Sequence, residues 1–111
     1  MIKIRVSYRT GDSFHDEDTE EDIELQWNNL AMAEESLRRI QNHHKWTEKN
    51  EYVHEKPKSK LPDGVVWLDD EHRATLELLT DEGKPYKYTP FWEGYFERLY
   101  DAEIVSKKYT P

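Results

Sequence analysis

The sequence predicts an α+β fold: a mainly antiparallel sheet of about five strands with one long and one short helix. Short runs in which apolar and polar residues alternate outnumber the helical segments. Turn-forming residues separate most of these runs, which is typical of strands joined by hairpins. One longer segment instead carries apolar residues three and four positions apart, as a helix does. The expected order along the chain is therefore β-β-α-β-β-β-α-β.

The first two strands are expected at residues 2–9 and 22–27. In both, apolar residues alternate with polar ones, which is the period of a strand with one buried face. Turn chemistry at 10–13 ends the first strand, and an acidic connection leads to the second. We expect the two strands to pair as a hairpin.

A long helix is expected to begin after Asn28 and Asn29, because asparagine is a favoured N-cap residue. We expect this helix to end between residues 47 and 50, with Leu37 and Ile40 facing the sheet. The apolar positions that define its inner face are Leu30, Ala33, Leu37, Ile40 and His44.

The chain is expected to form a single domain, 1–111, with a flexible charged connection at about 48–62. A length of 111 residues fits one domain. The connection is polar and holds Pro57 and Pro62, which suit neither a helix interior nor a central strand. We therefore predict that limited proteolysis cuts the chain there first.

Three strands are expected after the connection. Turn residues divide the apolar runs at 69–72 and 81–84. Gly83 supplies the positive φ that a hairpin turn often needs. The three strands are expected at 65–68, 73–79 and 85–88.

A short helix is expected through residues 92–100. Thr89 and Pro90 look like a cap followed by proline at the first helical position. Gly94 weakens this helix by about 1 kcal/mol relative to alanine. A last strand at 103–106 is expected to close the sheet.

The composition favours a folded protein despite its polarity. Charged residues make up 36% of the chain, and the mean hydropathy is -1.09. Four Trp, seven Tyr and three Phe argue against disorder, because disordered chains hold few aromatic residues. The absence of cysteine excludes disulfides, thiolate zinc sites and cysteine nucleophiles. No run approaches the roughly 20 apolar residues of a membrane helix, and the N-terminus does not resemble a signal peptide, so a cytoplasmic location is expected.

The net charge of -8 is concentrated in one part of the sequence. Residues 10–37 hold ten acidic residues and no lysine or arginine. Residues 38–60 carry more basic than acidic residues. Nucleic-acid binding depends on phosphate contacts, so we expect no direct binding of nucleic acid. A partner protein with a basic surface fits this charge pattern better.

No motif indicates catalysis, and we expect the protein not to be an enzyme. The chain lacks G-x-S-x-G, a Gly-rich phosphate loop and H-E-x-x-H. His15 beside Asp12 and Asp16 offers a general-base pair, but a solvated loop histidine is the commoner situation. The acidic run fails the EF-hand pattern, because Glu21 stands where glycine is needed and Trp27 where the bidentate glutamate belongs. We therefore expect no metal and no cofactor.

Two segments supply the candidate partner-binding residues. The acidic segment is either a binding surface or a solvated loop that keeps an edge strand soluble. The aromatic segment 91–100 is either core or interface, because aromatic residues and arginine are enriched in interface hot spots. The candidates are Asp12, Phe14, Asp16, Glu17, Asp18, Trp92, Tyr95 and Arg98.

Three motifs resemble a group of small accessory proteins of tailed bacteriophages. They are YRTGDSF at 8–14, WNNLAMA at 27–33, and FWEGYFERL at 91–99 with AEI at 102–104. The resemblance covers both ends of the chain and not the charged middle. It implies a viral protein acting in the host cell cytosol. By analogy, we expect a non-catalytic anti-defence or host-takeover protein that binds and inhibits a host defence or regulatory protein.

Two other functions remain open. A nucleotide immune signal could be held by a small-molecule binder, with Phe14, Trp92 and Tyr95 stacking on the base and Arg9 or Arg98 meeting phosphate. The net charge opposes this function. An acidic DNA mimic is the other alternative, although the acidic run is too short to line a long groove. The sequence also leaves a homo-oligomer open.

Overall fold

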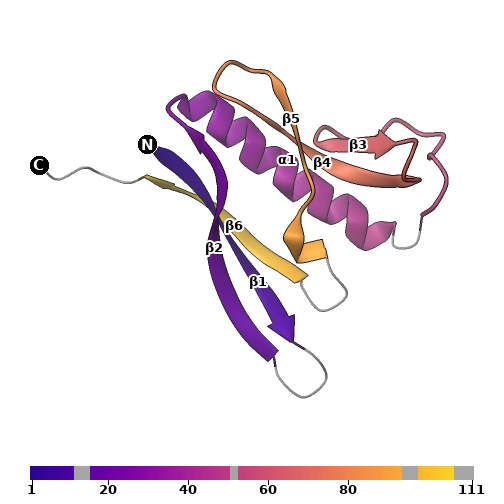
Figure 1. Ribbon diagram of the computed structural model, residues 1–111, viewed down its shortest axis with the longest axis horizontal. Coiled ribbons are helices and arrows are strands. Elements are labelled where there is room, and N and C mark those ends of the chain that lie inside the picture. Colours follow the sequence, from indigo (N-terminus) through magenta and orange to yellow (C-terminus); the bar gives the residue numbers. More distant parts are fainter. Residues whose placement is uncertain (12–15, 51–52, 94–97, 107–111) are drawn as a thin grey trace, which may run out of the picture.

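Two three-stranded antiparallel sheets and one α-helix make up the part of the chain that the structure describes (Figure 1). The computed structural model describes residues 1–11, 16–50, 53–93 and 98–106. The first sheet has the strand order β2-β1-β6, and the second has the order β3-β4-β5. The elements are β1 (Ile2–Gly11), β2 (Asp16–Trp27), α1 (Leu30–Lys49), β3 (Val65–Leu68), β4 (Arg73–Leu79), β5 (Pro85–Tyr88), a single 3₁₀ turn η1 (Phe91–Glu93) and β6 (Arg98–Ser106).

The α+β class and most of the expected elements are confirmed. Strands β3, β4 and β5 have the predicted bounds, and the β1–β2 and β4–β5 pairs are antiparallel as expected. The long helix begins where the two asparagines predict. Asn29 is its N-cap, and its side chain accepts hydrogen bonds from the backbone N–H groups of Ala31 and Met32 at 3.0 and 3.4 Å.

Three expectations were wrong. The strands form two sheets rather than one sheet of five. The segment 16–21, expected to be an acidic connection, is the first half of β2. The short helix through 92–100 is not formed: η1 is one turn, and Arg98–Tyr100 opens β6. Pairing with β1 makes Arg98–Tyr100 part of a strand, and the aromatic Tyr100 is a residue type that favours strands.

The inner face of α1 also differs in part from the expected face. Leu30 is 51% exposed, whereas Ala33, Ser36, Ile40 and His43 are buried. Ala33 and Ile40 are buried as expected, but Ser36 and His43 are buried where the pattern predicted Leu37 and His44. Leu37 is half-buried and packs at the edge of the core. The polar residues Ser36 and His43 therefore occupy core positions that a search for apolar residues misses.

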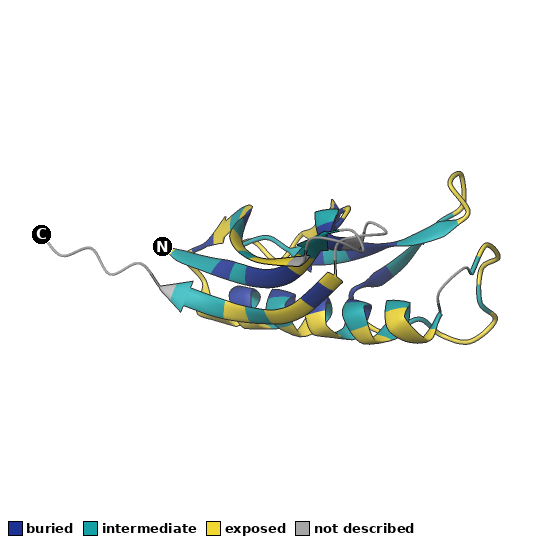
Figure 2. Cartoon of the chain, turned by 90° about the horizontal axis from the view of Figure 1, so that it is seen from below, coloured by how far each residue is buried: buried dark blue, intermediate teal, exposed yellow. Residues whose placement is uncertain are grey.

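The helix packs against both sheets and covers their inner faces (Figure 2). One hydrophobic core draws residues from β1, β2, α1, β4, β5, η1 and β6. Trp27 at the end of β2 is fully buried, and so are Leu76 and Leu78 of β4. This shared core fixes the position of the first sheet, and within the described ranges no α-helix other than α1 packs on it.

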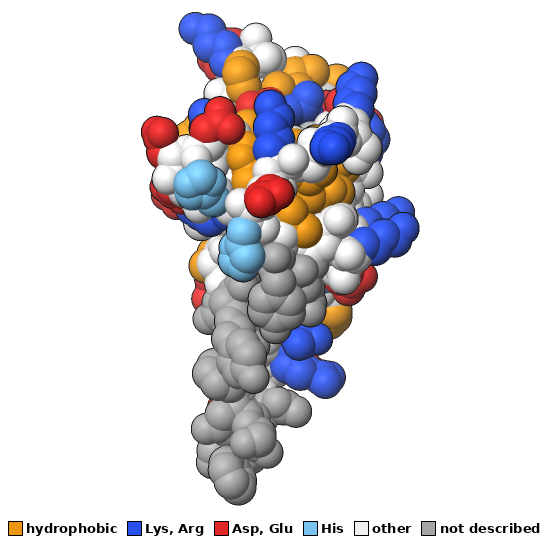
Figure 3. Space-filling view, turned by 90° about the vertical axis from the view of Figure 1, so that its right-hand side faces the viewer, with side chains coloured by type: hydrophobic (Ala, Val, Ile, Leu, Met, Phe, Trp, Pro, Cys, Tyr) orange, Lys and Arg blue, Asp and Glu red, His pale blue; other side chains and the backbone are white. Residues whose placement is uncertain are grey.

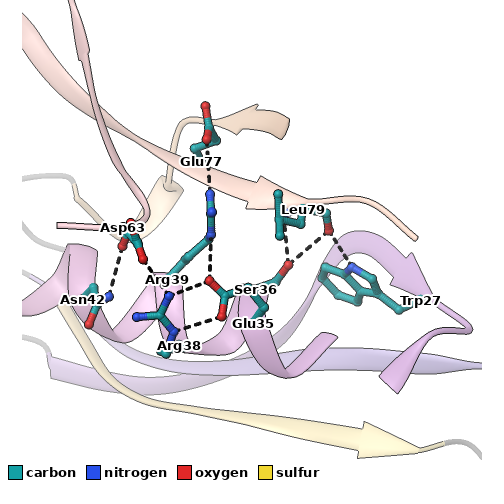
Figure 4. A network of polar contacts seen from close by, with 9 residues as sticks. All are labelled: Trp27, Glu35, Ser36, Arg38, Arg39, Asn42, Asp63, Glu77 and Leu79. Atoms are coloured by element: carbon teal, nitrogen blue, oxygen red, sulfur yellow. Dashed lines mark hydrogen bonds and ion pairs between the residues drawn. The ribbon is translucent and has the colours of Figure 1, made fainter. Parts of the chain in front are cut away.

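Polar contacts join α1 to β4 at the centre of the molecule (Figure 4). The Ser36 hydroxyl donates to the carbonyl of Leu79 and accepts from its N–H, both at 3.1 Å. The Trp27 indole N–H donates to the same carbonyl at 2.7 Å. Arg39 lies between Glu35 and Glu77, at 3.3 and 3.1 Å. The contacts of Ser36 with Leu79 and of Arg39 with Glu77 hold the helix on the second sheet, and the Trp27 contact joins β2 to β4.

The connection after α1 returns to the helix before β3 begins. Asp63 forms an ion pair with Arg38 at 2.9 Å, and Asn42 donates to the Asp63 carbonyl. Gly64 has φ +99, and a Cβ there would lie 2.7 Å from the Cβ of Arg39. Only glycine suits both the backbone conformation and the close approach. Whether the rest of the connection is flexible stays a prediction.

Candidate functional site

The outer face of the β2-β1-β6 sheet, the face turned away from α1, is the candidate site. Residues directly opposite one another in an antiparallel sheet point to the same face. Ile4, Val6 and Tyr8 of β1 are buried against the core, so the residues between them point outward. The strand register then gives three charged rows across the outer face: Asp22–Arg5–Glu103, Glu20–Ser7–Asp101 and Asp18–Arg9–Arg98.

Basic residues of the central strand offset the acidic residues of β2. Arg5 contacts Asp22 at 3.0 Å, and Arg9 contacts Asp18 at 3.4 Å. The hydrogen bond and charge of Asp22 raise the pKa of Arg5, with smaller contributions from Glu20 and Glu103. The acidic run, which holds no lysine or arginine of its own, is therefore partly neutralised in the fold. The bases come from β1 because the acidic run is a strand paired with it.

A bulge in β6 decides which of its residues face outward. Ser7 lies opposite Asp101 and Tyr8 opposite Leu99, so Tyr100 is an extra residue with no partner position on β1. The extra residue shifts the alternation by one. Leu99 therefore points into the core, where it is 6% exposed, and Arg98 points outward beside Arg9.

The structure brings together one residue from each candidate segment. Asp18 of the acidic segment and Arg98 of the aromatic segment flank Arg9 in a single row. Glu17 is exposed and also lies on β2. Asp16 begins β2, although only its backbone is described. Asp12, Phe14 and Tyr95 lie outside the described residues.

Trp92 lies in the core and not on the outer face of the sheet. It is 3% exposed, and its ring lies 6.0 Å from that of Tyr88 and 5.0 Å from that of Phe91. Phe91 in turn meets Tyr8 edge-on at 5.1 Å. Of the two functions considered for this segment, core packing describes Trp92, and a partner could not reach its ring without moving η1.

Sequence reasoning missed Arg9 and Arg5 as members of the site. The signal was present: every second residue of the first strand is polar, and three of these residues are basic. A hairpin that continues through the acidic run places Arg5 opposite Asp22 and Arg9 opposite Asp18. The strand register was needed to show these pairs, because the sequence predicted a long connection where the second strand already begins at Asp16.

Apart from Arg5, the groups with shifted pKa values lie away from the outer face of the β2-β1-β6 sheet. Ion pairs lower the pKa values of Glu35 and Asp63 and raise that of Arg38, all on the helix or the connection. Burial lowers the pKa of His43 to about 4 and raises that of Tyr88 to about 12. Among the described residues no three metal-binding side chains gather in one place. The same residues include no helix long and apolar enough to span a membrane.

A second charged surface lies at the end of the molecule that holds the connection and the β3–β4 turn. Figure 3 shows basic, acidic and histidine side chains there around patches of hydrophobic surface. The exposed lysines in the last part of α1 and in the connection that follows it are Lys45, Lys49, Lys56, Lys58 and Lys60. The basic part of the sequence is thus separate from the acidic strand β2.

Searches against protein-family models, curated proteins and solved structures find no match for this chain.

Proposed function

We propose that this protein is a non-catalytic binding protein whose partner docks on the outer face of the β2-β1-β6 sheet. The partner is a host defence or regulatory protein that the bound phage protein inhibits, as the resemblance to phage accessory proteins implies. The binding takes place in the host cytosol.

The observation that carries this proposal is the row Asp18–Arg9–Arg98. It joins two segments that lie about eighty positions apart in the sequence and that both show features of an interface. Arginine is enriched in binding hot spots, and Arg9 and Arg98 are both exposed. The described residues place no helix over this face, and its Asp18, Arg9 and Arg98 side chains are exposed to another protein.

The acidic strand β2 indicates the charge of the partner. Glu20 of β2 and Asp101 of β6 are exposed on the outer face, on either side of Ser7, and no ion pair is seen for them among the described residues. A basic surface on the partner would complement these carboxylates. The row at Arg9 adds a position where the partner can place an anionic group.

Capture from bacterial lysate tests this proposal. The protein, immobilised, is compared with the double variant Arg9→Gln/Arg98→Gln. The control variant is Arg38→Gln, which removes one basic side chain from the exposed part of the helix. We expect one host protein to be retained by the wild type and the control and lost from the double variant.

Two results would count against the proposal. One is capture that survives the double variant unchanged, which would place the partner elsewhere. The other is no specific capture even after chemical crosslinking. Circular dichroism of each variant shows that a loss of capture is not a loss of folding.

A further inference from the structure

We infer that Arg9 and Arg98 together form a binding site for a phosphoryl group. The site lies on the face proposed to bind the partner, and its role there rests on the proposed function. Its affinity for phosphate depends on the two arginines and not on a protein partner. The shared ligand chemistry is a phosphate dianion, either free or attached to a larger molecule such as a nucleotide.

The two arginines are placed as a pair by the strand register. Arg9 and Arg98 are directly opposite one another on β1 and β6. Opposite residues in an antiparallel sheet have Cα atoms about 4.5–5.5 Å apart, so both guanidinium groups can reach one ligand. Each guanidinium presents a planar fork of donors that matches two oxygens of a phosphate.

The β6 bulge is what makes this pair. If Tyr100 took a regular position in the ladder instead of forming a bulge, strict alternation from Asp101 would turn Leu99 outward and Arg98 toward the core. The bulge buries Leu99 and at the same time brings a second positive charge beside Arg9. Bulges commonly re-aim a side chain next to a functional site.

The pair is unfavourable without an anion. Like charges directly opposite on neighbouring strands destabilise a sheet. Arg5, in the same strand and on the same face, has an acid on each side, Asp22 and Glu103. Arg9 has an acid on one side only, and no ion pair is seen for Arg98 among the described residues. A phosphate dianion would supply the charge that this row lacks.

Asp18 competes with the ligand for Arg9. Its carboxylate lies 3.4 Å from the Arg9 Nε, a long contact between side chains that are 59% and 63% exposed. Such an exposed pair is weak, so a phosphate can replace it. If the two arginines bind phosphate, removal of the Asp18 carboxylate should strengthen that binding. If the Asp18–Arg9 pair has only a structural role, its removal should not.

The test is an NMR titration of the whole protein with inorganic phosphate, at constant ionic strength set with chloride. The Nε–Hε signals of Arg9 and Arg98 are followed, with Arg5 as the reference. We expect both signals to shift together on a saturating curve and the Arg5 signal to stay in place. A parallel titration with AMP distinguishes the sources: equal affinity assigns the site to phosphate itself, and tighter binding of AMP assigns it to a phosphoryl group carried on a nucleotide.

Four variants sharpen the result. Arg9→Gln and Arg98→Gln should each weaken binding by about fivefold or more, because each removes a charged hydrogen-bonding partner. Lys87→Gln, which makes the same change in net charge at an exposed position on β5 of the other sheet, should change the affinity by less than about twofold. Asp18→Asn should tighten binding by about twofold or more.

Linear shifts without saturation, or equal shifts at Arg5, would overturn the inference. Unchanged or weaker binding by Asp18→Asn would also overturn it. The titration needs no protein partner and the lysate capture needs no phosphate. Failure of the phosphate site and failure of the proposed function are therefore separate results.

Discussion

At the scale of single residues, polar side chains in the core decide how the helix sits. Ser36 and His43 are both buried, at 0% and 1% exposure. Ser36 is satisfied by the backbone of Leu79 at the end of β4. A buried histidine has a different consequence, because its charged form is disfavoured in the core and stability then depends on pH.

Stability should fall as the pH is lowered from 7 to 5. Burial lowers the pKa of His43 to about 4, and the neighbouring His44 adds to the shift. In the unfolded chain the histidine pKa is about 6.5, so between these values the unfolded state binds the proton and the folded state does not. The loss attributable to His43 at pH 5 is about 2 kcal/mol.

Urea unfolding of the wild type and of His43→Gln at pH 7 and pH 5 measures this effect. The variant is less stable at both pH values, but its stability should change less between them. An equal pH dependence in the two proteins would show that His43 takes up its proton in the folded state as readily as in the unfolded one.

At the scale of elements, the sequence patterns predicted the existence and class of most segments. They failed where pairing with another strand decides where a strand begins and which face each residue takes. The Asn29 cap and the hairpin turn at Gly83 are local signals, and both were correct. β2 was predicted too short, because acidic residues are poor strand formers; in the fold the segment pairs with β1, which places Arg9 opposite Asp18 and Arg5 opposite Asp22. The bulge at Tyr100 leaves no local signal, so Leu99 and Arg98 could not be assigned to their faces in advance.

The revised inner face of α1 predicts a sharp contrast between two helix positions. Ile40 is 1% exposed in the core, whereas Leu30 is 51% exposed at the first turn. Ile40→Ala should cost about 2–5 kcal/mol of unfolding free energy, and Leu30→Ala should change it by less than about 0.5 kcal/mol. Chemical denaturation of both variants checks this, and similar losses at the two positions would mean that the helix is rotated from its place in Figure 1.

At the scale of the whole molecule, charge is arranged by strand rather than by sequence region alone. The acidic segment appears as one negative block in the sequence, but β1 places arginines against Asp18 and Asp22. The remaining exposed acids on β2 are Glu17, Glu20, Glu21 and Glu24. Composition predicted the acidic surface, and the register was needed to show which acids are still available to a partner.

If the available acids steer a basic partner, neutralising them should slow association. We expect Glu17→Gln/Glu20→Gln/Glu21→Gln to lower the association rate and its salt dependence, because screening acts only on charges that are present. Glu34→Gln/Glu82→Gln/Asp70→Asn makes the same change in net charge on other exposed residues and should have less effect. Association rates at low and high salt, measured with the captured partner, compare the two. Equal rates and salt slopes for both triple variants would contradict steering by β2.

The central claim is that the partner docks on the outer face of the β2-β1-β6 sheet. Site-specific photo-crosslinking in bacterial cells tests it most directly, with the crosslinker placed at Glu20 on that face or at Gln41 on the exposed side of α1. Both positions are exposed, so neither substitution should disturb the core. We predict a discrete adduct from position 20 that disappears in the Arg9→Gln/Arg98→Gln background, and none from position 41. An adduct from position 41 alone, or equal adducts from both, would contradict the account.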